Sequence, residues 1–497
     1  MGQRSTTGYY NIFSELIQNR LSRLSEAETS GAEAPKRRRS AKPTPLVDLS
    51  SENQISVETD SDVEVLESYN DEPVAAEIPC AVSQRPWDNV SNATTVESAR
   101  SSQSESFEFS LVSYNLLCQE TISTTMYLYG HCYNHPQWLD WQHRFDILKK
   151  EMQFLNADIL CLQEVGALEY HSSILPFAES LGYRGVFKKR TGPDKPDGCA
   201  TLYRSSKFTL EEEIPVEYKI EQTFLDRDNI GLVLVLKPKC DHRRVQTHPG
   251  SAPVKAKLPR LVVANTHLLF NPRRGDVKFG QLAMLLAAVE KAAYKSTNHH
   301  HRSSTYRPII LCGDMNALPS SAIYDFLMDG RYQYVGQSQY ELSGQGKTGG
   351  PVMGPVLLPP QAGISQRCQY QESLAQRLTE AAEENSALAP PPDSGTLEHP
   401  FHFATVYDHK REWTTFHGRE CCTVDYIFYS VRRRKQRQAR RYSANLSAIS
   451  CGLREGRLRL IKRLRLPTFE EKYEDPLPNA ACSSDHIPLA AVFQLNL

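Results

Sequence analysis

The sequence predicts an α/β fold for a domain that begins near residue 107. From there, short apolar runs with the length of buried strands alternate with segments whose apolar residues recur at helical spacing. Arg144–Leu155 and Gly280–Tyr294 are predicted as crossover helices. The predicted strands are Phe109–Tyr114, Asp158–Leu162, Leu232–Leu236, Leu261–Thr266, Ile309–Cys312, Val424–Tyr429 and His486–Phe493. Because this alternation continues to the C-terminus, one α/β domain is expected to occupy most of residues 107–497.

Three stretches interrupt the alternation, near residues 238–258, 295–306 and 336–400. The last contains Pro390–Pro392 and many Gln, Ser and Glu residues. Such a composition is too polar and too rich in proline for a core, so a flexible surface insertion is predicted there.

Two segments near the C-terminus are rich in basic residues. Arg432–Arg441 is densely basic, and both a solvated loop and a contact with an RNA backbone are open interpretations. Arg457–Leu466 alternates Leu with Arg or Lys, which predicts a strand with one apolar and one cationic face. Residues 107–497 carry more basic than acidic side chains, which suits a polyanionic ligand as well as an ordinary solvated surface.

Residues 1–106 are predicted to be a largely disordered, acidic tail. Ser, Glu, Pro and Asp dominate residues 25–106, and no sustained apolar period could offset the entropy of ordering. Apolar residues near 9–24 fall on one helical face, which indicates either a short helix that docks on a partner protein or on the domain itself, or a transient helix without a partner. Lys36–Arg39 suits a nuclear-import or RNA-contacting patch, or a solvated run of charge.

The cysteines and the apolar pattern point to a reducing compartment. The 12 cysteines form no C-x-x-C pair, and Cys118, Cys161 and Cys312 lie in or beside apolar runs, as small buried hydrophobic residues do. No apolar signal region follows Met1 and no long apolar span occurs. We therefore expect a cytoplasmic or nuclear location without membrane attachment.

Polar residues with catalytic chemistry accompany the predicted strands. Taken singly, each also suits a turn or a cap, but six such stretches in one chain are hard to explain by turns alone. Five share one design, in which an apolar strand runs into an Asn, Asp, Glu or His at its end, where a parallel sheet presents groups to solvent. The stretches are Ser113-Tyr114-Asn115, Leu162-Gln163-Glu164, Asn265-Thr266-His267, Gly313-Asp314-Met315-Asn316 and Ser483-Ser484-Asp485-His486, to which Thr423-Val424-Asp425 is added.

These residue types indicate which metal the site would take. Carboxylate and amide oxygens without clustered Cys or closely spaced His suit Mg²⁺, or Mn²⁺, and argue against tetrahedral zinc. Magnesium in such a site favours phosphate chemistry. A metal held by Glu164 would polarise a phosphoryl oxygen, a carboxylate would deprotonate the attacking water, and a His or the metal would steady the leaving oxygen.

In order and spacing, these stretches resemble the endonuclease/exonuclease/phosphatase superfamily. Ser113–Cys118, Pro196–Ala200 and Val424–Tyr429 are similar to the branch typified by the carbon catabolite repressor deadenylases and nocturnin. Trp138–Arg144 and Thr414–His417 resemble the Angel proteins within that branch. The resemblance covers about residues 107–497 apart from the insertions, and it implies a four-layered α/β sandwich with two central β-sheets and an active site at one open end.

The resemblance also implies a role for each site residue. Glu164 would be the main Mg²⁺ ligand, with Asn115 beside it and Asp485 supporting the metal. The remaining implied roles concern the water and the phosphate. Asp314, also close enough to the metal to serve as a ligand, would orient or deprotonate the attacking water. Asn316 would hold the scissile phosphate, and His267 would contact a phosphate oxygen. His486, supported by Asp425, would stabilise the pentacovalent phosphorane.

One departure from the family pattern concerns the substrate. Poly(A)-specific members carry an Asn two residues before the Thr-Phe pair, whereas this chain has Trp413. Angel-type proteins are associated with removing 2′,3′-cyclic phosphates from RNA ends, so the preferred expectation is a Mg²⁺-dependent phosphoesterase acting there. The alternatives are a poly(A)-specific 3′-5′ exoribonuclease, a phosphoesterase for DNA, inositol phosphates or lipids, and an inactive module that binds RNA or protein.

Overall fold

The structure is a computed structural model that describes residues 80–90, 106–239, 244–245, 254–255, 258–298, 303–345, 349–383, 392–433 and 453–496. Every described element belongs to one unit, Ala75–Leu497. The expectations for a helix near 9–24 and for Lys36–Arg39 lie outside the described residues. None of the helices in the described ranges combines the length and the apolar character needed to cross a membrane.

The first of two large sheets has seven strands in the order β1-β22-β23-β2-β3-β5-β4. β2 and β3 are parallel, while β23 and β5 flank them in antiparallel pairing. The strands are β1 (Trp87–Asn89), β22 (Leu458–Leu464), β23 (Leu489–Asn496), β2 (Ser106–Asn115), β3 (Ile159–Gly166), β5 (Asp197–Arg204) and β4 (Tyr183–Lys189).

The second sheet has six strands in the order β16-β19-β13-β10-β7-β6. Its central pair, β10 and β13, is parallel, and its other pairs are antiparallel. The strands are β16 (Phe403–Thr405), β19 (Asp425–Ser430), β13 (Ile309–Asp314), β10 (Leu261–His267), β7 (Ile230–Pro238) and β6 (Phe208–Glu217).

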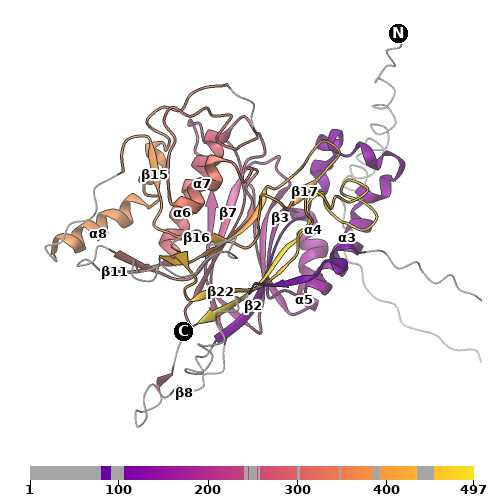
Figure 1. The fold of residues 1–497 in the computed structure, drawn as a ribbon, viewed down its shortest axis with the longest axis horizontal. Helices are drawn as coiled ribbons and strands as arrows, with labels where there is room; N and C mark the ends of the chain where they lie inside the picture. Colours follow the sequence, from indigo (N-terminus) through magenta and orange to yellow (C-terminus); the bar gives the residue numbers. More distant parts are fainter. Residues whose placement is uncertain are drawn as a thin grey trace, which may run out of the picture. The chain divides into compact units, whose positions relative to one another are not determined.

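Helices connect the parallel strands and cover the outer faces of the sheets. α3 (Trp141–Leu155) links β2 to β3, and α6 (Gly275–Ala293) links β10 to β13, as predicted for crossover helices. The side chain of Asp140 caps α3 by accepting a hydrogen bond from the Gln142 N–H. Figure 1 shows α3 and α5 (Leu175–Ser180) on one side of the sheets, and α6 and α7 (Ala322–Asp329) on the other.

Side-chain alternation along the strands builds the four layers. Leu111 of β2 faces the core between the two sheets, whereas Val112 packs under the helices that include α3. Val263 of β10 faces the same central core, and Val262 packs against α6. Since successive strand residues point to opposite faces, apolar runs without alternation mark strands that are buried on both sides. The predicted four-layered sandwich is confirmed.

The remaining elements are short. The other helices are α2 (Ile122–Thr125), α4 (Ala167–Glu169) and α8 (Gln371–Glu383), with single turns at Ala81–Gln84, Gln119–Thr121, Met126–Leu128, Gly130–Asn134, Pro136–Leu139, Tyr170–Ile174 and Pro360–Ala362. Five two-stranded pairs complete the described structure: β8 (Arg244–Val245) with β9 (Val254–Lys255), β11 (Tyr294–Asn298) with β12 (Ser303–Tyr306), β14 (Arg331–Gln333) with β15 (Thr396–Glu398), β17 (Thr415–Phe416) with β18 (Cys421–Cys422), and β20 (Arg432–Arg433) with β21 (Leu453–Arg454).

The domain contains a segment that the sequence analysis placed in the tail. β1 pairs with β22, and Val82 is buried in the core beneath α3. The Arg85 guanidinium donates to the carbonyl oxygens of Arg465 at 2.7 Å and Pro488 at 2.9 Å. Residues 80–90 therefore belong to the domain and extend it toward the N-terminus. The sequence did not predict this, because the few side chains that anchor the segment form no periodic apolar pattern.

The predicted flexible insertion at 336–400 is corrected for its described residues. Met353, Leu357 and Cys368 are buried against α6, and Arg377 of α8 forms a buried ion pair with Glu290 of α6 at 2.6 Å. α6 is buried along almost its entire length. A helix that is apolar on all sides needs a cover on its outer face, and the polar-looking insertion supplies it.

Candidate active site

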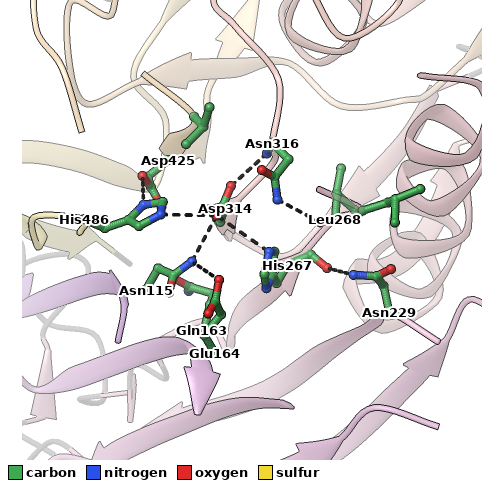
Figure 2. A network of polar contacts seen from close by, with 12 residues as sticks. Asn115, Gln163, Glu164, Asn229, His267, Leu268, Asp314, Asn316, Asp425 and His486 are labelled. Carbon is green, nitrogen blue, oxygen red and sulfur yellow. Dashed lines mark hydrogen bonds and ion pairs between the residues drawn. The ribbon is translucent and has the colours of Figure 1, made fainter. Parts of the chain in front are cut away.

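The predicted site residues meet at one edge of the two sheets. Asn115 ends β2, and Glu164 lies in the adjacent parallel strand β3. His267 and Asp314 end the parallel strands β10 and β13. Because parallel strands present their carboxyl ends at the same edge, four residues from two sheets converge, as Figure 2 shows.

Three further residues reach this edge from the opposite chain direction. Asp425 is the first residue of β19 and lies opposite Asp314 in the antiparallel register. Asp485 and His486 precede β23, which runs antiparallel to β2. The prediction that a strand runs into Asp485 and His486 was wrong, because an antiparallel strand begins at the edge where its neighbour ends.

Two unusual backbone conformations aim the side chains into the site. Glu164 has a φ of 49° at an irregularity in the β3–β5 register between Leu162 and Val165. Such a bulge turns a strand side chain away from its regular direction. Gly313 has a φ of 135°, and a Cβ there would lie 2.0 Å from the carbonyl oxygen of Thr266. Only glycine fits directly before Asp314.

Asn115 joins the two sheets at the site. Its Nδ2 donates to Glu164 Oε1 at 3.1 Å and to Asp314 Oδ2 at 3.0 Å. Its Oδ1 accepts from the Leu117 N–H at 3.0 Å, which fixes the orientation of the amide. The Cys118 N–H donates to the other Glu164 oxygen at 3.1 Å. One amide side chain therefore holds the half-buried carboxylate of Glu164 and the buried carboxylate of Asp314 within reach of a common ligand.

Asp314 lies at the centre of the site. Its Oδ2 is 3.7 Å from His267 Nε2 and 3.9 Å from His486 Nε2, and its Oδ1 accepts from the Asn316 N–H at 2.8 Å. Burial, and then the neighbouring carboxylate of Asp425, raise the pKa of Asp314 above its ordinary value. A carboxylate with a raised pKa is a stronger base, which suits removal of a proton from water.

His486 is held as a cation by carboxylates. Its Nδ1 lies 2.8 Å from Asp425 Oδ2, and its Nε2 lies 4.0 Å from Asp485 Oδ1. Burial opposes protonation, but Asp425 and Asp485 outweigh it and raise the pKa of His486 well above its ordinary value. The Asp425 pairing leaves Nε2 as the ring nitrogen that faces Asp314, so a positive N–H points to the centre of the site.

Asn316 and His267 retain free hydrogen-bonding capacity. Asn316 Nδ2 donates to the Leu268 carbonyl oxygen at 3.0 Å, which leaves the second amide hydrogen available. His267 Nδ1 and Asp425 Oδ1 are buried and have no hydrogen-bond partner. Buried polar atoms without a partner are costly unless a ligand satisfies them, so the site is built for a polar ligand.

The donor set fits a divalent cation. Asp314, Asp425 and His486 place ligand atoms within 4.8 Å of one another. A protonated His486 has no lone pair to give, so the carboxylate oxygens expected from the sequence, those of Glu164, Asp314 and Asp485, are the better donors. The expectation that Asn115 is also a ligand is not met in this orientation, because its Oδ1 accepts from the Leu117 N–H and its Nδ2 faces the carboxylates. Burial, with Asp485 close by, raises the pKa of Glu164 although His267 opposes this. A bound cation would relieve the cost of burying these carboxylates together.

Two residues to which the sequence analysis gave no role support the site. The Tyr129 hydroxyl donates to Asp485 Oδ2 at 2.9 Å. The buried Arg144 guanidinium donates to the carbonyl oxygens of Ser483 at 2.8 Å and Leu116 at 2.7 Å, and thereby ties together the segments that carry Asp485 and Asn115. Two signals could have identified Arg144: it belongs to the Trp138–Arg144 stretch that resembles the Angel proteins, and it lies on the buried side of α3, where an arginine is unusual.

Comparisons with known proteins agree with this architecture. The model of the Endonuclease/Exonuclease/phosphatase family matches residues 112–486. Protein angel homolog 2 of Homo sapiens is 39% identical over 410 residues, which cover 79% of this chain and 70% of that protein. Protein angel homolog 1 of Homo sapiens is 34% identical over 487 residues, which cover 86% of this chain and 69% of that protein.

A solved structure is similar in both fold and sequence. It is a crystal structure of ANGEL2, described as a 2′,3′-cyclic phosphatase, in complex with adenosine-2′,3′-vanadate. Its TM-score with this chain is 0.64 at 36% sequence identity, and the match covers 83% of this chain and 99% of the other. The chain therefore belongs to the endonuclease/exonuclease/phosphatase family of phosphoesterases, and within that family it is a relative of the Angel proteins.

Proposed function

We propose that this protein is a Mg²⁺-dependent phosphoesterase that opens 2′,3′-cyclic phosphates at the 3′ ends of RNA. The observation that carries the proposal is the similarity to ANGEL2, a 2′,3′-cyclic phosphatase, at 36% identity over 83% of this chain. The convergence of Glu164, Asp314 and His486 around Asn115 supports it, because this arrangement can bind a metal, activate water and stabilise negative charge.

In this proposal Glu164, Asp314 and Asp485 would hold Mg²⁺, and Asn115 would position two of these carboxylates. When bound, the ion polarises a phosphoryl oxygen and neutralises part of the charge that develops there. Asn115 sets the distance between the Glu164 and Asp314 carboxylates through its two hydrogen bonds. Tyr129 orients Asp485 through its hydroxyl, so that the carboxylate does not turn out of the site.

The remaining residues would act on the water and the phosphate. Asp314, whose pKa is raised by burial, takes a proton as water attacks phosphorus. One ring P–O bond breaks, and the ribose oxygen that leaves takes a proton from water to become a hydroxyl. His486, held as a cation by Asp425, stabilises the negative charge of the pentacovalent phosphorane. Asn316, with its remaining amide hydrogen, and His267 would contact phosphate oxygens.

The surroundings of Trp413 favour a cyclic phosphate over poly(A). Trp413 is fully buried, its Nε1 donates to the Thr468 carbonyl oxygen at 3.1 Å, and its ring packs against Phe416 and Tyr473. A side chain used in this way cannot clamp a terminal base as an asparagine would. An enzyme without that clamp is suited to reading the terminal ribose phosphate, which is shared by all four nucleotides.

The test compares two RNAs with the same sequence in the presence of Mg²⁺. One ends in a 2′,3′-cyclic phosphate and the other is a poly(A) tract with a 3′-hydroxyl. The expected result is loss of the cyclic phosphate with the poly(A) tract intact, whereas shortening of poly(A) with the cyclic end untouched would establish the exoribonuclease alternative.

Two variants connect the activity to the site. Glu164→Ala should lower the rate by orders of magnitude, because it removes the main proposed metal ligand. Glu179→Ala changes an exposed carboxylate on α5 and is the matched control. Full activity in Glu164→Ala would show that the reaction occurs elsewhere. Inactivity of the parent on both RNAs would favour a module that only binds RNA or protein.

A further inference from the structure

A cluster of arginines lies at the end of the domain opposite the active site. It surrounds two adjoining depressions of about 440 Å³ and 330 Å³ that share Arg432, Gly456 and Arg457. We call the two together the arginine pocket. Its basic side chains are His402, Arg307, Arg432, Arg433, Arg454 and Arg457.

Strand direction places the arginine pocket away from the site. Asp314 ends β13, whereas Ile309, the first residue of β13, lines the pocket. Asp425 begins β19, whereas Ser430, its last residue, lines the pocket. At ~3.3 Å per strand residue, the five steps along each of these strands separate the two sites by about 17 Å. No residue of the arginine pocket belongs to the active site.

Most of the guanidinium groups in the pocket have no carboxylate partner in the described part of the chain. Among the described residues, no carboxylate forms an ion pair with Arg432, Arg433, Arg454 or Arg457. The one acidic residue in the lining, Glu455, is already engaged: it accepts from the Leu460 N–H at 2.8 Å and lies 3.6 Å from Arg459.

The backbone brings two of these charges face to face. Arg432 of β20 is the direct cross-strand partner of Arg454 of β21. Like charges in this position are destabilising unless an anion lies between or above them. The pKa of His402 is lowered by burial and then by the charge of Arg433, which is consistent with an uncompensated positive field in the pocket.

The chemistry of the lining identifies the class of ligand. The cations are all guanidinium groups, with the imidazole of His402 beside them and no lysine among the lining residues. Planar guanidinium groups bind phosphate oxygens in pairs. The half-buried ring of Tyr306 lies beside them, supported edge-on by the buried ring of Phe401 at a centroid distance of 5.3 Å. Cations beside aromatic rings suit a single-stranded nucleic acid, which offers both phosphates and planar bases.

We infer that the arginine pocket binds the phosphate backbone of single-stranded RNA, upstream of the 3′ end that occupies the active site. This inference rests on the proposed function only for the choice of RNA over another polyanion. The pocket would then give longer RNAs a second point of attachment, whereas an RNA too short to reach around the domain would depend on the active site alone.

The test measures binding of the full chain to a labelled RNA with a 3′-hydroxyl, without added divalent cation, by fluorescence anisotropy. The RNA has about 20 nucleotides, longer than the ~4–16 nucleotides of common single-strand sites. Arg432→Gln combined with Arg457→Gln removes two pocket charges. Lys149→Gln combined with Lys150→Gln removes two charges from α3, in the helical layer on the far side of the seven-stranded sheet, and is the matched control.

The pocket variant should bind the long RNA more weakly than the control variant does. The slope of log affinity against log salt should fall by about 1.4, because each phosphate contact to a single strand contributes roughly 0.7. Replacing the same arginines with lysine should restore most of the slope, since lysine keeps the charge. Hydrolysis of a trinucleotide 2′,3′-cyclic phosphate with Mg²⁺ should be unchanged in the pocket variant.

Equal slopes and affinities in the pocket variant and the control variant would overturn the inference. Binding of a poly-glutamate peptide that depends on Arg432 and Arg457, with RNA binding unaffected, would instead assign the pocket to an acidic protein partner and would equally overturn it. Anisotropy measures RNA binding and does not depend on catalysis. If the parent protein failed to hydrolyse the trinucleotide, the proposed function would be refuted, but the binding measurements would still test the arginine pocket.

Discussion

The replacement of Glu151 by Gln should make the domain more stable at alkaline pH and leave it unchanged in mild acid. Glu151 lies on α3 and is 2% exposed, and its Oε2 accepts from the Ser483 hydroxyl at 2.7 Å and the Tyr114 hydroxyl at 3.1 Å. Burial raises the pKa of this carboxyl from 4.5 to about 7, although Arg85 and Arg144 favour its charged form.

The sign follows from proton binding in the two states. Below pH 4.5 the carboxyl is protonated in both the folded and the unfolded chain, so its burial carries no ionisation penalty. Between pH 4.5 and about 7 the unfolded chain releases the proton and the folded chain keeps it, so the free energy of unfolding falls as pH rises. One pKa unit corresponds to about 1.4 kcal/mol, and the full loss above pH 7 is about 3 kcal/mol.

Glutamine keeps an oxygen that can accept both hydroxyl hydrogen bonds and cannot ionise. With an unfolding entropy of roughly 0.8 kcal/mol per kelvin for a domain of this size, the Tm of Glu151→Gln relative to the parent should rise by about 3–4 °C between pH 5 and pH 8. Thermal melts at both pH values measure this difference, with Glu179→Gln on the exposed side of α5 as the control for charge removal. Equal destabilisation at both pH values would mean that Glu151 is ionised in the folded state and that the reasoning is wrong.

Three other substitutions test the construction of the domain and the site. Gly313→Ala should abolish the folded, active enzyme, because its Cβ would lie 2.0 Å from a backbone oxygen; a normal Tm would contradict this. Arg377→Met should destabilise by about 3–5 kcal/mol and expose α8 to limited proteolysis, since Glu290 would be buried without its partner, and Glu290→Gln in addition should restore resistance. Asp425→Asn should move the alkaline limb of the kcat/KM profile to lower pH, because Asp425 raises the pKa of His486; an unmoved limb would refute the pairing.

The sequence alone determined the class of the domain and the identity of its polar residues. Runs such as Leu261–Ala264 and Ile309–Cys312 are apolar at consecutive positions, which happens when a strand is buried on both faces. The helical spacing in Gly280–Tyr294 implied a crossover between them, and α6 has that position. These features are local, because hydrophobic periodicity depends only on neighbouring residues.

The tertiary structure decided which polar groups touch and what covers the core. Asn115 and Asp314 are separated by 199 residues, and only the packing of one sheet on the other brings them to 3.0 Å. Nothing in the local sequence of residues 336–400 predicts that Arg377 meets Glu290, because a polar, proline-containing segment looks the same whether it is solvated or covers a helix.

The arginine pocket, too, is formed only by the tertiary structure. Arg432 and Arg457 belong to segments that each suit an ordinary solvated surface, and only the pairing of β20 with β21 gathers their charges at one end of the domain. Local propensity therefore determined the helices and strands of this protein. The long-range pairing of strands determined its active site, because residues that lie far apart in the sequence become neighbours only when their strands pair and pack.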